Sequence, residues 1–342
     1  MTKQLDAYAR AGVNIAAGQE AVRLMRDAVR STHGAEVLSD VGAFGGLYSL
    51  AAVQQMQEPV LVATTDGVGT KTMVAAQLQR WDTLGQDLVN HCINDLLVQG
   101  AHPLFFLDYI AAPVLQPEVV AALVKGMAVA CRTAQCALLG GETAEMPDIY
   151  APDQLDLVGT MVGVVERSMI IDGSRIQAGD MLLGLPSTGL HTNGYTLARH
   201  VLAELDWTEP YRILGDTTLA EALLAVHRSY LDPVQKLLRA GIDIHGMAHI
   251  TGGGVVDNLP RILPNGVQAI IRRGTWREPP IFGLIQQRGQ LSQHELFHTF
   301  NMGLGMILVV PPGHATRALA TLTVDLSVVG EVVKGNAGVI IA

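Results

Sequence analysis

The sequence predicts an α/β fold of the α+β type, divided into two domains. With 342 residues, the chain is longer than a typical single hydrophobic core. Strand-like apolar runs alternate with segments of helical spacing, and the helices are expected to cover one face of an open sheet, which favours a sandwich over a doubly wound fold. A polar, glycine-rich segment at residues 172–180 marks a break. We therefore expect an N-terminal domain at residues 1–170 and a C-terminal domain at residues 171–342.

The N-terminal half contains the expected elements of one sheet and its helices. Val22, Met25 and Val29 recur at helical spacing and predict a helix over residues 18–31. A glycine-rich turn follows at residues 42–46. The remaining elements are expected in this order: a strand at 60–63, a helix at 82–99, a strand at 104–110, a helix at 116–134, and strands at 137–139 and 157–165.

The C-terminal half repeats the mixture of strands and helices after the break. A strand at residues 181–185 is expected to begin it, and residues 207–216 are expected to form a surface loop. The other expected elements are helices at 194–204, 218–240, 254–262 and 293–299, and strands at 267–272, 305–310 and 326–333.

Composition limits the partners of the chain. The formal net charge is -9 without a basic cluster, which argues against nucleic acid. Cys92, Cys131 and Cys136 form no CxxC pair and are typical of buried thiols in a reducing compartment. The N-terminus carries no apolar signal region, and no apolar run approaches the roughly 18–20 residues that cross a bilayer. We expect a soluble cytoplasmic protein that binds no membrane.

A short loop after the first expected strand offers groups for a phosphate site. Residues 64–71 read TTDGVGTK, so Asp66, Gly67, Gly69 and Lys71 lie together at a strand end. Bare backbone, a cation and a carboxylate can bind phosphates and their metal ion. The spacing is not that of a Walker A loop. An ordinary turn with a solvated lysine is the alternative.

The helix expected at residues 82–99 carries a stripe of short polar side chains. At about 100° per residue, Asp87, His91, Asn94 and Asp95 fall on one arc, opposite an apolar arc. A solvated face is the alternative, although such faces usually carry Lys, Glu and Arg. Short side chains hold a fixed geometry, which favours a role toward a metal or a substrate.

A third carboxylate follows paired glycines. Residues 140–147 read GGETAEMP, which places Glu142 beside a strand end. A turn with a charged tip is the alternative. Asp66, Asp95 and Glu142 could together hold magnesium through oxygen ligands while ATP phosphates complete its shell. No short spacing joins the three residues, so their convergence is an inference.

Two loops of the second half are further candidates. His191 lies on the loop PSTGLHTNGY (residues 186–195), where an imidazole can meet a phosphate or transfer a proton; an incidental loop histidine is the alternative. Asn193 suits a helix N-cap. Gly252, Gly253 and Gly254 precede an expected helix, whose unpaired N–H groups can form an anion site; a flexible linker is the alternative. Asn301 is expected to be structural.

At these residues the chain resembles the AIR synthetase (phosphoribosylformylglycinamidine cyclo-ligase) family over nearly its whole length. The resemblance runs from the YARAGVNI segment at residues 8–15 to about residue 332. Its most specific motifs are TDGVGTK (65–71), NDLLVQGA (94–101), FFLDY (105–109), GGETAEMP (140–147), GLHTNGY (189–195) and HITGGG (249–254).

The resemblance implies two α/β halves, with the N-terminal sheet forming a barrel shared across a homodimer. It also implies a reaction: formylglycinamidine ribonucleotide and ATP would yield aminoimidazole ribonucleotide, ADP and phosphate in purine biosynthesis. ATP would phosphorylate the formyl amide oxygen, and the amidine nitrogen would then close the ring. Positioning and charge stabilisation would dominate such catalysis.

The resemblance also implies roles for individual residues. Asp66, Asp95 and Glu142 would hold Mg²⁺ on the triphosphate, and His191 and Asn193 would face the substrate, with His191 transferring a proton. The nucleotide would be bound by groups of two loops. These are Gly67, Gly69, Thr70 and Lys71, with Lys71 neutralising phosphoryl charge, and Gly252, Gly253 and Gly254.

Two departures from the family pattern lie near the N-terminus, where Arg10 replaces a lysine and Asn14 replaces an aspartate. Residues 32–35 (THGA) also lack the basic pair often found before the glycine-rich turn in the family. Arg10 and Asn14 leave a non-catalytic nucleotide-binding paralogue as one alternative. Another ATP-using member of the superfamily is the second. Selenophosphate synthetase requires a reactive cysteine or selenocysteine near the N-terminal glycines, and this sequence has no cysteine before Cys92. The hydrogenase-maturation enzyme ends in a cysteine, whereas this sequence ends in VIIA. Thiamine-monophosphate kinase lacks the context of His191.

Overall fold

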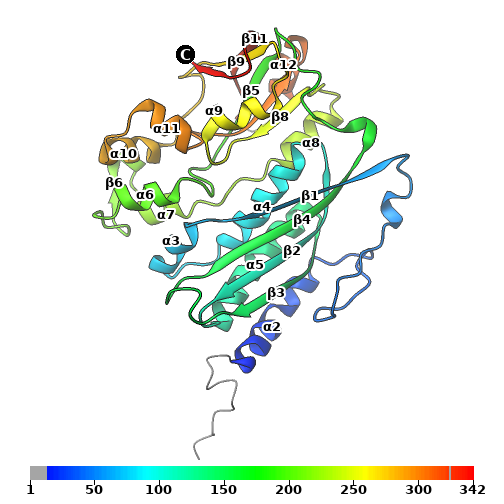
Figure 1. Ribbon diagram of the computed structural model, residues 1–342, viewed down its shortest axis with the longest axis vertical. Coiled ribbons are helices and arrows are strands. Elements are labelled where there is room, and N and C mark those ends of the chain that lie inside the picture. The colour runs from blue at the N-terminus through cyan, green and yellow to red at the C-terminus, as the bar shows by residue number, and fades with distance from the viewer. Residues whose placement is uncertain (1–13, 323–324) are drawn as a thin grey trace, which may run out of the picture. The chain divides into compact units, whose positions relative to one another are not determined.

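The structure, a computed structural model, describes residues 14–322 and 325–342. The chain divides into two compact units. Unit 1 contains the residues up to Cys92 and His102–Glu166, and unit 2 contains Ile93–Ala101 and Arg167–Ala342. The division falls inside helix α4 (Leu84–Leu97), so the last residues of this helix belong to unit 2. Each unit combines a sheet with helices (Figure 1), and the α+β class expected from the sequence is confirmed.

Unit 1 is built on a four-stranded sheet with the strand order β1-β4-β2-β3. The strands β2 and β3 are parallel and connected through α5, whereas β4 is antiparallel to both of its neighbours. The elements of this unit, besides α4, are α2 (Ile15–Arg30), the 3-10 helix η1 (Ala51–Val53), β1 (Pro59–Gly67), α3 (Lys71–Leu78), β2 (His102–Ala112), α5 (Pro117–Ala134), β3 (Ala137–Glu145) and β4 (Asp156–Glu166).

Glycines allow α4 to pack closely in unit 1. A Cβ atom at Gly85 would lie 2.0 Å from the carbonyl oxygen of Leu123 on α5. On the sheet, a Cβ at Gly159 would lie 2.1 Å from the ring of Phe106 and 3.1 Å from the Leu88 side chain of α4. Any larger residue at Gly85 or Gly159 would therefore push the helix away from its neighbours.

Unit 2 contains a six-stranded sheet with the order β12-β9-β11-β5-β10-β8 and a small two-stranded sheet. The strand β10 is buried at every position, as its continuous apolar sequence predicts. The strands are β5 (Met181–Pro186), β6 (Pro210–Tyr211), β7 (Thr217–Thr218), β8 (Gly246–His249), β9 (Val267–Ile271), β10 (Leu304–Val310), β11 (Ser327–Lys334) and β12 (Val339–Ile341).

The helices of unit 2 are mostly short. Besides the end of α4, they are η2 (Arg167–Met169), α6 (Tyr195–Val201), η3 (Arg212–Leu214), α7 (Leu219–Leu223), α8 (Leu231–Arg239), α9 (Gly254–Asn258), η4 (Leu259–Ile262), α10 (Pro280–Gly289), α11 (Gln293–Thr299) and α12 (Pro312–Thr321). Among the described residues, no helix combines the length and apolar composition needed to span a bilayer.

The prediction of one helix over residues 218–240 was wrong. The structure has α7 and α8 with an irregular segment at residues 224–230 between them. A side chain from a distant part of unit 2 contributes to this break, because Asn94 Oδ1 accepts a hydrogen bond of 2.9 Å from the backbone N–H of Tyr230. The apolar periodicity of the segment gives no sign of that partner.

Candidate active site

Three of the four residues in the polar stripe of α4 are buried and Asp95 is 27% exposed, so the alternative of a solvated face is wrong. Asp87 and Asn94 are fully buried, and His91 is 2% exposed. Each of them contacts a polar group from another segment, as described below. The short side chains therefore serve as fixed binding groups within the protein.

Lys71 forms an ion pair with Asp87 in the interior of unit 1. Its Nζ lies 2.7 Å from Asp87 Oδ2, and neither side chain is exposed. Burial lowers the pKa of Lys71, and the charge and hydrogen bond of Asp87 oppose that shift. The structure thus places the ammonium on a protein carboxylate, and a direct contact with a phosphoryl group would require this pair to open.

Asp66 lies at the end of β1 and contacts α4. Its Oδ2 atom lies 2.9 Å from Nε2 of His91, and its Oδ1 accepts a hydrogen bond of 2.7 Å from the Gly67 N–H. The side chain is 45% exposed, so the carboxylate is held by the protein on one side and reaches solvent on the other. Gly69, with φ +54°, and Thr70 complete the turn into α3.

Glu142 does not meet Asp66 in unit 1, because the two residues lie on the opposite edge strands of the sheet. Asp66 on β1 pairs with Gly159 of β4, Gly159 pairs with Asp108 of β2, and Asp108 pairs with Gly141 of β3. Strands are spaced about 4.8 Å apart, so the backbone positions of Asp66 and Glu142 are separated by about 14 Å. One ion bound directly by both carboxylates does not fit this register.

Asp108 is a site residue that the sequence reasoning missed. It lines a cavity of 530 Å³ together with Glu142 and the glycine-rich segment from Gly42 to Gly46. Burial, reinforced by the nearby Glu142 carboxylate, raises the pKa of Asp108 to about 7. The residue stood within the expected strand FFLDY, and nothing local separated it from a structural aspartate.

In unit 2, the loop after β5 holds His191 in an unusual backbone conformation. Its φ of +62° is rare for a residue with a side chain, and such strain gathers at functional sites. The Nε2 atom accepts a hydrogen bond of 3.2 Å from the Thr188 N–H. Asn301 fixes the loop, since its Nδ2 donates to the Gly189 carbonyl at 2.8 Å and its Oδ1 accepts from Ser187 Oγ at 2.9 Å, which confirms its expected structural role.

Asn193 is not the N-cap of the following helix, contrary to the prediction. Gly194 occupies that position with φ +79° and makes the turn into α6 without a side-chain cap. Asn193 instead lies beside the glycine loop: a Cβ at Gly252 would be 3.1 Å from Asn193 Oδ1. The Asn193 side chain therefore lies next to the Gly252–Gly254 loop, which we had also predicted to be part of the site.

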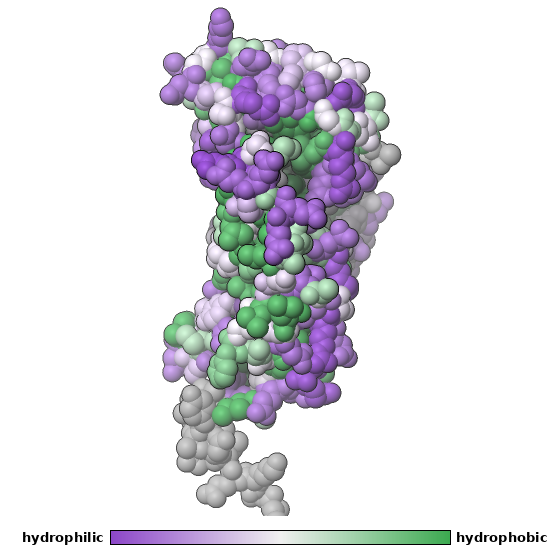
Figure 2. Space-filling model, turned by 90° about the vertical axis from the view of Figure 1, so that its right-hand side faces the viewer, coloured by the Kyte–Doolittle hydropathy of each residue, from purple (hydrophilic) through white to green (hydrophobic). Residues whose placement is uncertain are grey.

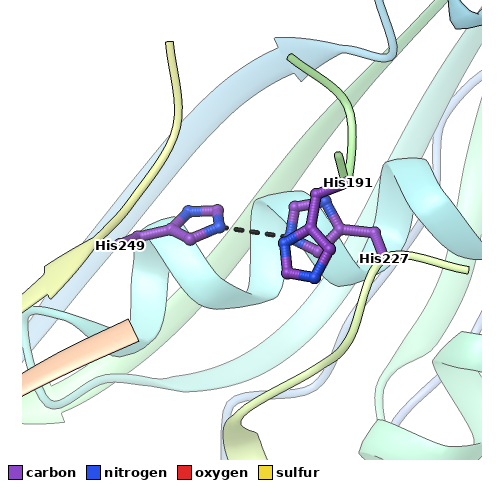
Figure 3. A group of neighbouring side chains, drawn as sticks. All are labelled: His191, His227 and His249. Atoms are coloured by element: carbon purple, nitrogen blue, oxygen red, sulfur yellow. Dashed lines mark hydrogen bonds between the residues drawn. The ribbon is translucent and has the colours of Figure 1, made fainter. Parts of the chain in front are cut away.

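His191 is one of three buried histidines gathered in unit 2 (Figure 3). It stacks on His227 with ring centroids 4.0 Å apart, and His227 Nε2 lies 3.1 Å from His249 Nε2. Asp95, which is 27% exposed, accepts a hydrogen bond of 2.8 Å from His249 Nδ1. His227 had no signal in the sequence, because residue 227 fell inside an expected helix.

The Gly252–Gly254 loop owes its glycines to backbone geometry. Gly253 and Gly254 have φ values of +89° and +62°, and a Cβ at Gly254 would lie 2.0 Å from the Phe297 carbonyl oxygen. Asn258 donates to the carbonyls of Gly252 and Gly254 at 3.1 and 2.7 Å. The helix α9 that follows has only five residues. Phosphate binding by this loop stays a prediction.

Of the two N-terminal departures, Arg10 lies outside the described residues. Asn14 is the N-cap of α2, and its Oδ1 accepts a hydrogen bond of 3.2 Å from the Ala17 N–H. Its backbone N–H donates to the carboxylate of Glu145. An asparagine in this position therefore serves the helix end, which an aspartate would serve equally well.

Comparison with known proteins identifies the family. The chain matches the N-terminal domain of the AIR synthase related proteins over residues 48–165 and their C-terminal domain over residues 177–342. It is 49% identical to the phosphoribosylformylglycinamidine cyclo-ligase of Geotalea daltonii, an alignment covering 99% of this chain and 98% of that one. It is also 49% identical to that of Shouchella clausii, covering 98% of each.

Solved structures share the fold at low identity. The hydrogenase maturation protein HypE in complex with ATP has a TM-score of 0.66 and 19% identity, covering 93% of this chain and 90% of that chain. The resemblance proposed from the sequence motifs is confirmed by the sequence comparisons: this chain belongs to the phosphoribosylformylglycinamidine cyclo-ligase family.

Proposed function

We propose that the chain catalyses the ATP-dependent closure of formylglycinamidine ribonucleotide to aminoimidazole ribonucleotide, with release of ADP and phosphate. The observation that carries this proposal is the identity of 49% over nearly the full length to proteins named for that reaction. The positions of the proposed site residues support it. Asp66 lies near the end of β1 and Asp95 on α4, both partly exposed, and His191 lies on a strained loop. Glu142 lies within β3 and not at a strand end as expected from the sequence, because β3 continues to Glu145.

The reaction requires little covalent chemistry from the protein. The γ-phosphoryl group of ATP is transferred to the formyl oxygen, the amidine nitrogen attacks the formyl carbon, and the C–O bond breaks so that phosphate leaves with that oxygen. The nitrogen loses a proton as the ring closes. In this scheme His191 transfers that proton. Its ring is held in place for this role, because Asn301 fixes its loop and the ring stacks on His227.

The carboxylates of Asp66, Asp95 and Glu142 offer the oxygen ligands that Mg²⁺ prefers. Asp66 and Asp95 each bond a histidine while remaining 45% and 27% exposed, and Glu142 is exposed at a cavity of 530 Å³. Bound Mg²⁺ would neutralise charge on the phosphates. Asp66 and Glu142 lie on opposite edge strands. We therefore propose that they hold different Mg²⁺ ions, which would contact different oxygens of the triphosphate.

The turn from Gly67 to Thr70 and the Gly252–Gly254 loop are proposed to contact the nucleotide phosphates through backbone N–H groups. Lys71 supports the first of them from within, since it begins α3 directly after Thr70 and its ammonium is held by Asp87. A second candidate position for the nucleotide is the cavity between Glu142 and the Gly42–Gly46 segment, whose volume suits a small ligand.

A homodimer built through the sheet of unit 1 is proposed from the exposure of β1. Alternate residues Leu61, Ala63 and Thr65 are exposed, and Leu61 retains 64% of its surface. Figure 2 shows hydrophobic residues gathered in several patches on one side of the molecule. A second copy of the chain is the proposed cover for this strand.

The proposed place of action is the cytoplasm, which agrees with Cys92, Cys131 and Cys136 being free and buried thiols. The function is tested by incubating the purified chain with formylglycinamidine ribonucleotide and MgATP and measuring aminoimidazole ribonucleotide and ADP. One ADP formed for each product is expected. Binding of ATP without any product would favour the non-catalytic paralogue, and turnover of another superfamily substrate would favour the second alternative.

A further inference from the structure

Three histidines from separate segments of unit 2 place their rings together in the interior. His191 comes from the loop after β5, His227 from the segment before α8, and His249 from the end of β8 (Figure 3). Their exposures are 2%, 0% and 6%. One ring nitrogen of each lies within 4.8 Å of the other two. Buried histidines in such a group require an explanation beyond packing.

The hydrogen bonds of Asn94 show which nitrogen of His227 carries a lone pair. Asn94 Oδ1 accepts from the Tyr230 N–H at 2.9 Å, and Nδ2 donates to the Arg228 carbonyl at 2.8 Å. These two backbone partners settle the orientation of the amide. The same Nδ2 lies 3.1 Å from His227 Nε2, so this nitrogen acts as an acceptor.

The partner of His249 fixes its orientation in a similar way. Its Nδ1 donates to Asp95 Oδ1 at 2.8 Å, an arrangement that orients metal-binding histidines in many proteins. A neutral ring then presents the lone pair of Nε2 to His227 Nε2, 3.1 Å away. Two lone pairs at this distance repel each other unless a positive group lies beside both.

We propose that His191, His227 and His249 form a binding site for a borderline divalent transition-metal ion of the Zn²⁺ class. Imidazole nitrogen suits this class of ion, whereas Mg²⁺ takes oxygen ligands, so the two kinds of ion use different ligand atoms, although Asp95 adjoins both sites. Zn–N bonds of about 2.0–2.1 Å in tetrahedral geometry separate two nitrogens by about 3.3 Å, close to the spacing of His227 and His249.

His191 supplies the third ligand after a shift of its ring toward the pair, and while it binds the ion that ring nitrogen does not transfer protons. The ion replaces the Asn94 amide as the partner of His227, which gives up one neutral hydrogen bond. A water molecule takes the fourth position. Asp95 both orients His249 and supplies negative charge next to the ion. Its side chain is 27% exposed, so the residue that bonds the ligand His249 itself reaches solvent.

The experiment is a titration of the whole, chelator-treated chain with Co²⁺ as a spectroscopic probe, followed by competition with Zn²⁺. One Co²⁺ per chain with the intense visible bands of a tetrahedral site is expected, and Zn²⁺ should abolish them. Loss of an outer-shell partner weakens metal binding by about 10–100-fold, so His227→Gln, which removes a ligand, should weaken it by at least about 100-fold.

The matched control removes an exposed histidine, His294, and a half-buried one, His298. His294 and His298 lie one turn apart on α11 with ring centroids 4.2 Å apart, and they form the natural competing surface site. The double variant His294→Ala/His298→Ala should bind Co²⁺ as the unaltered chain does. Loss of binding in this variant, or unchanged binding in His227→Gln, would overturn the proposal.

A second measurement needs no variant and so does not depend on the folding of one. Diethyl pyrocarbonate modifies histidine nitrogens, and mass spectrometry locates the modified residues. One equivalent of Zn²⁺ should slow modification of His191, His227 and His249, whereas protection of His294 and His298 should need excess Zn²⁺. If no Co²⁺ band forms and Zn²⁺ protects none of the three, a proton rather than a metal ion lies between the rings. Both readouts report ion binding, so they are independent of the cyclisation proposed above.

Discussion

The ammonium of Lys71 lies 2.7 Å from the carboxylate of Asp87, and both side chains are completely buried. The pair joins the first residue of α3 to α4 in unit 1. It stands directly after the turn that the sequence selected for phosphate binding. The TDGVGTK motif led us to expect Lys71 to contact a phosphoryl group. In this structure Lys71 instead holds the turn that precedes it, through its ion pair with Asp87.

Removal of one charge from this pair should destabilise the protein strongly. Asp87→Asn leaves the Lys71 ammonium buried without its counter-ion, which costs about 3–5 kcal/mol in the free energy of unfolding. Denaturant unfolding measures it. The control is Asp232→Asn, which breaks the exposed Lys236–Asp232 pair and should cost less than about 1 kcal/mol. The double variant Lys71→Met/Asp87→Leu should recover much of the lost stability. If Asp87→Asn and Asp232→Asn lowered the free energy of unfolding equally, the argument from burial would be contradicted.

Asp95→Asn should abolish most turnover while the fold is retained. The asparagine Oδ1 can still accept the hydrogen bond of His249 Nδ1, whereas the negative charge proposed to hold Mg²⁺ is lost. We expect kcat to fall by about 100-fold or more, the scale found when a transition-state contact is removed. The melting temperature should stay within a few degrees. A variant that unfolds at mild temperature would show that the charge of Asp95 serves the structure instead.

His191→Ala should lower kcat more than it weakens ATP binding. Proton transfer by a positioned side chain contributes about 10²–10⁴-fold, so kcat should fall on this scale while the KM for ATP changes little. Steady-state kinetics with each substrate varied in turn separates the two effects. His200→Ala, on the exposed end of α6, is the control. An unchanged kcat in His191→Ala would remove the residue from the mechanism.

Asp108 should make stability depend on pH. Burial raises the pKa of this carboxyl to about 7 from 3.8, so between these pH values the folded chain keeps a proton that the unfolded chain has released. Stability should therefore fall as the pH rises from about 4 to 7. Asp108→Asn removes this contribution and should raise the melting temperature at pH 8 more than at pH 5. The same difference at both pH values would show that the carboxyl titrates normally.

The sequence predicted those features whose cause is local. The strands at 181–185 and 305–310 and the helices at 116–134 and 293–299 agree closely with β5, β10, α5 and α11, because their apolar spacing or capping residues determine them. The polar arc of α4 followed from helical periodicity alone.

The features that it could not predict depend on distant partners. Lys71 looks like a solvated lysine until Asp87, sixteen positions away, is placed beside it. His227 was hidden in an expected helix that Asn94 helps to interrupt. Asp108 acquires its shifted pKa from burial in the sheet, which no spacing reveals. For the same reason, the separation of Asp66 from Glu142 became evident only from the strand order.

The most direct test of the proposed reaction follows the formyl oxygen. Formylglycinamidine ribonucleotide labelled with ¹⁸O at that position is incubated with the purified chain and MgATP, and the inorganic phosphate is analysed by mass spectrometry. Phosphorylation of the formyl oxygen predicts one ¹⁸O atom in each phosphate released with aminoimidazole ribonucleotide. Unlabelled phosphate accompanying the product would contradict the account, because the oxygen would then have left by another route.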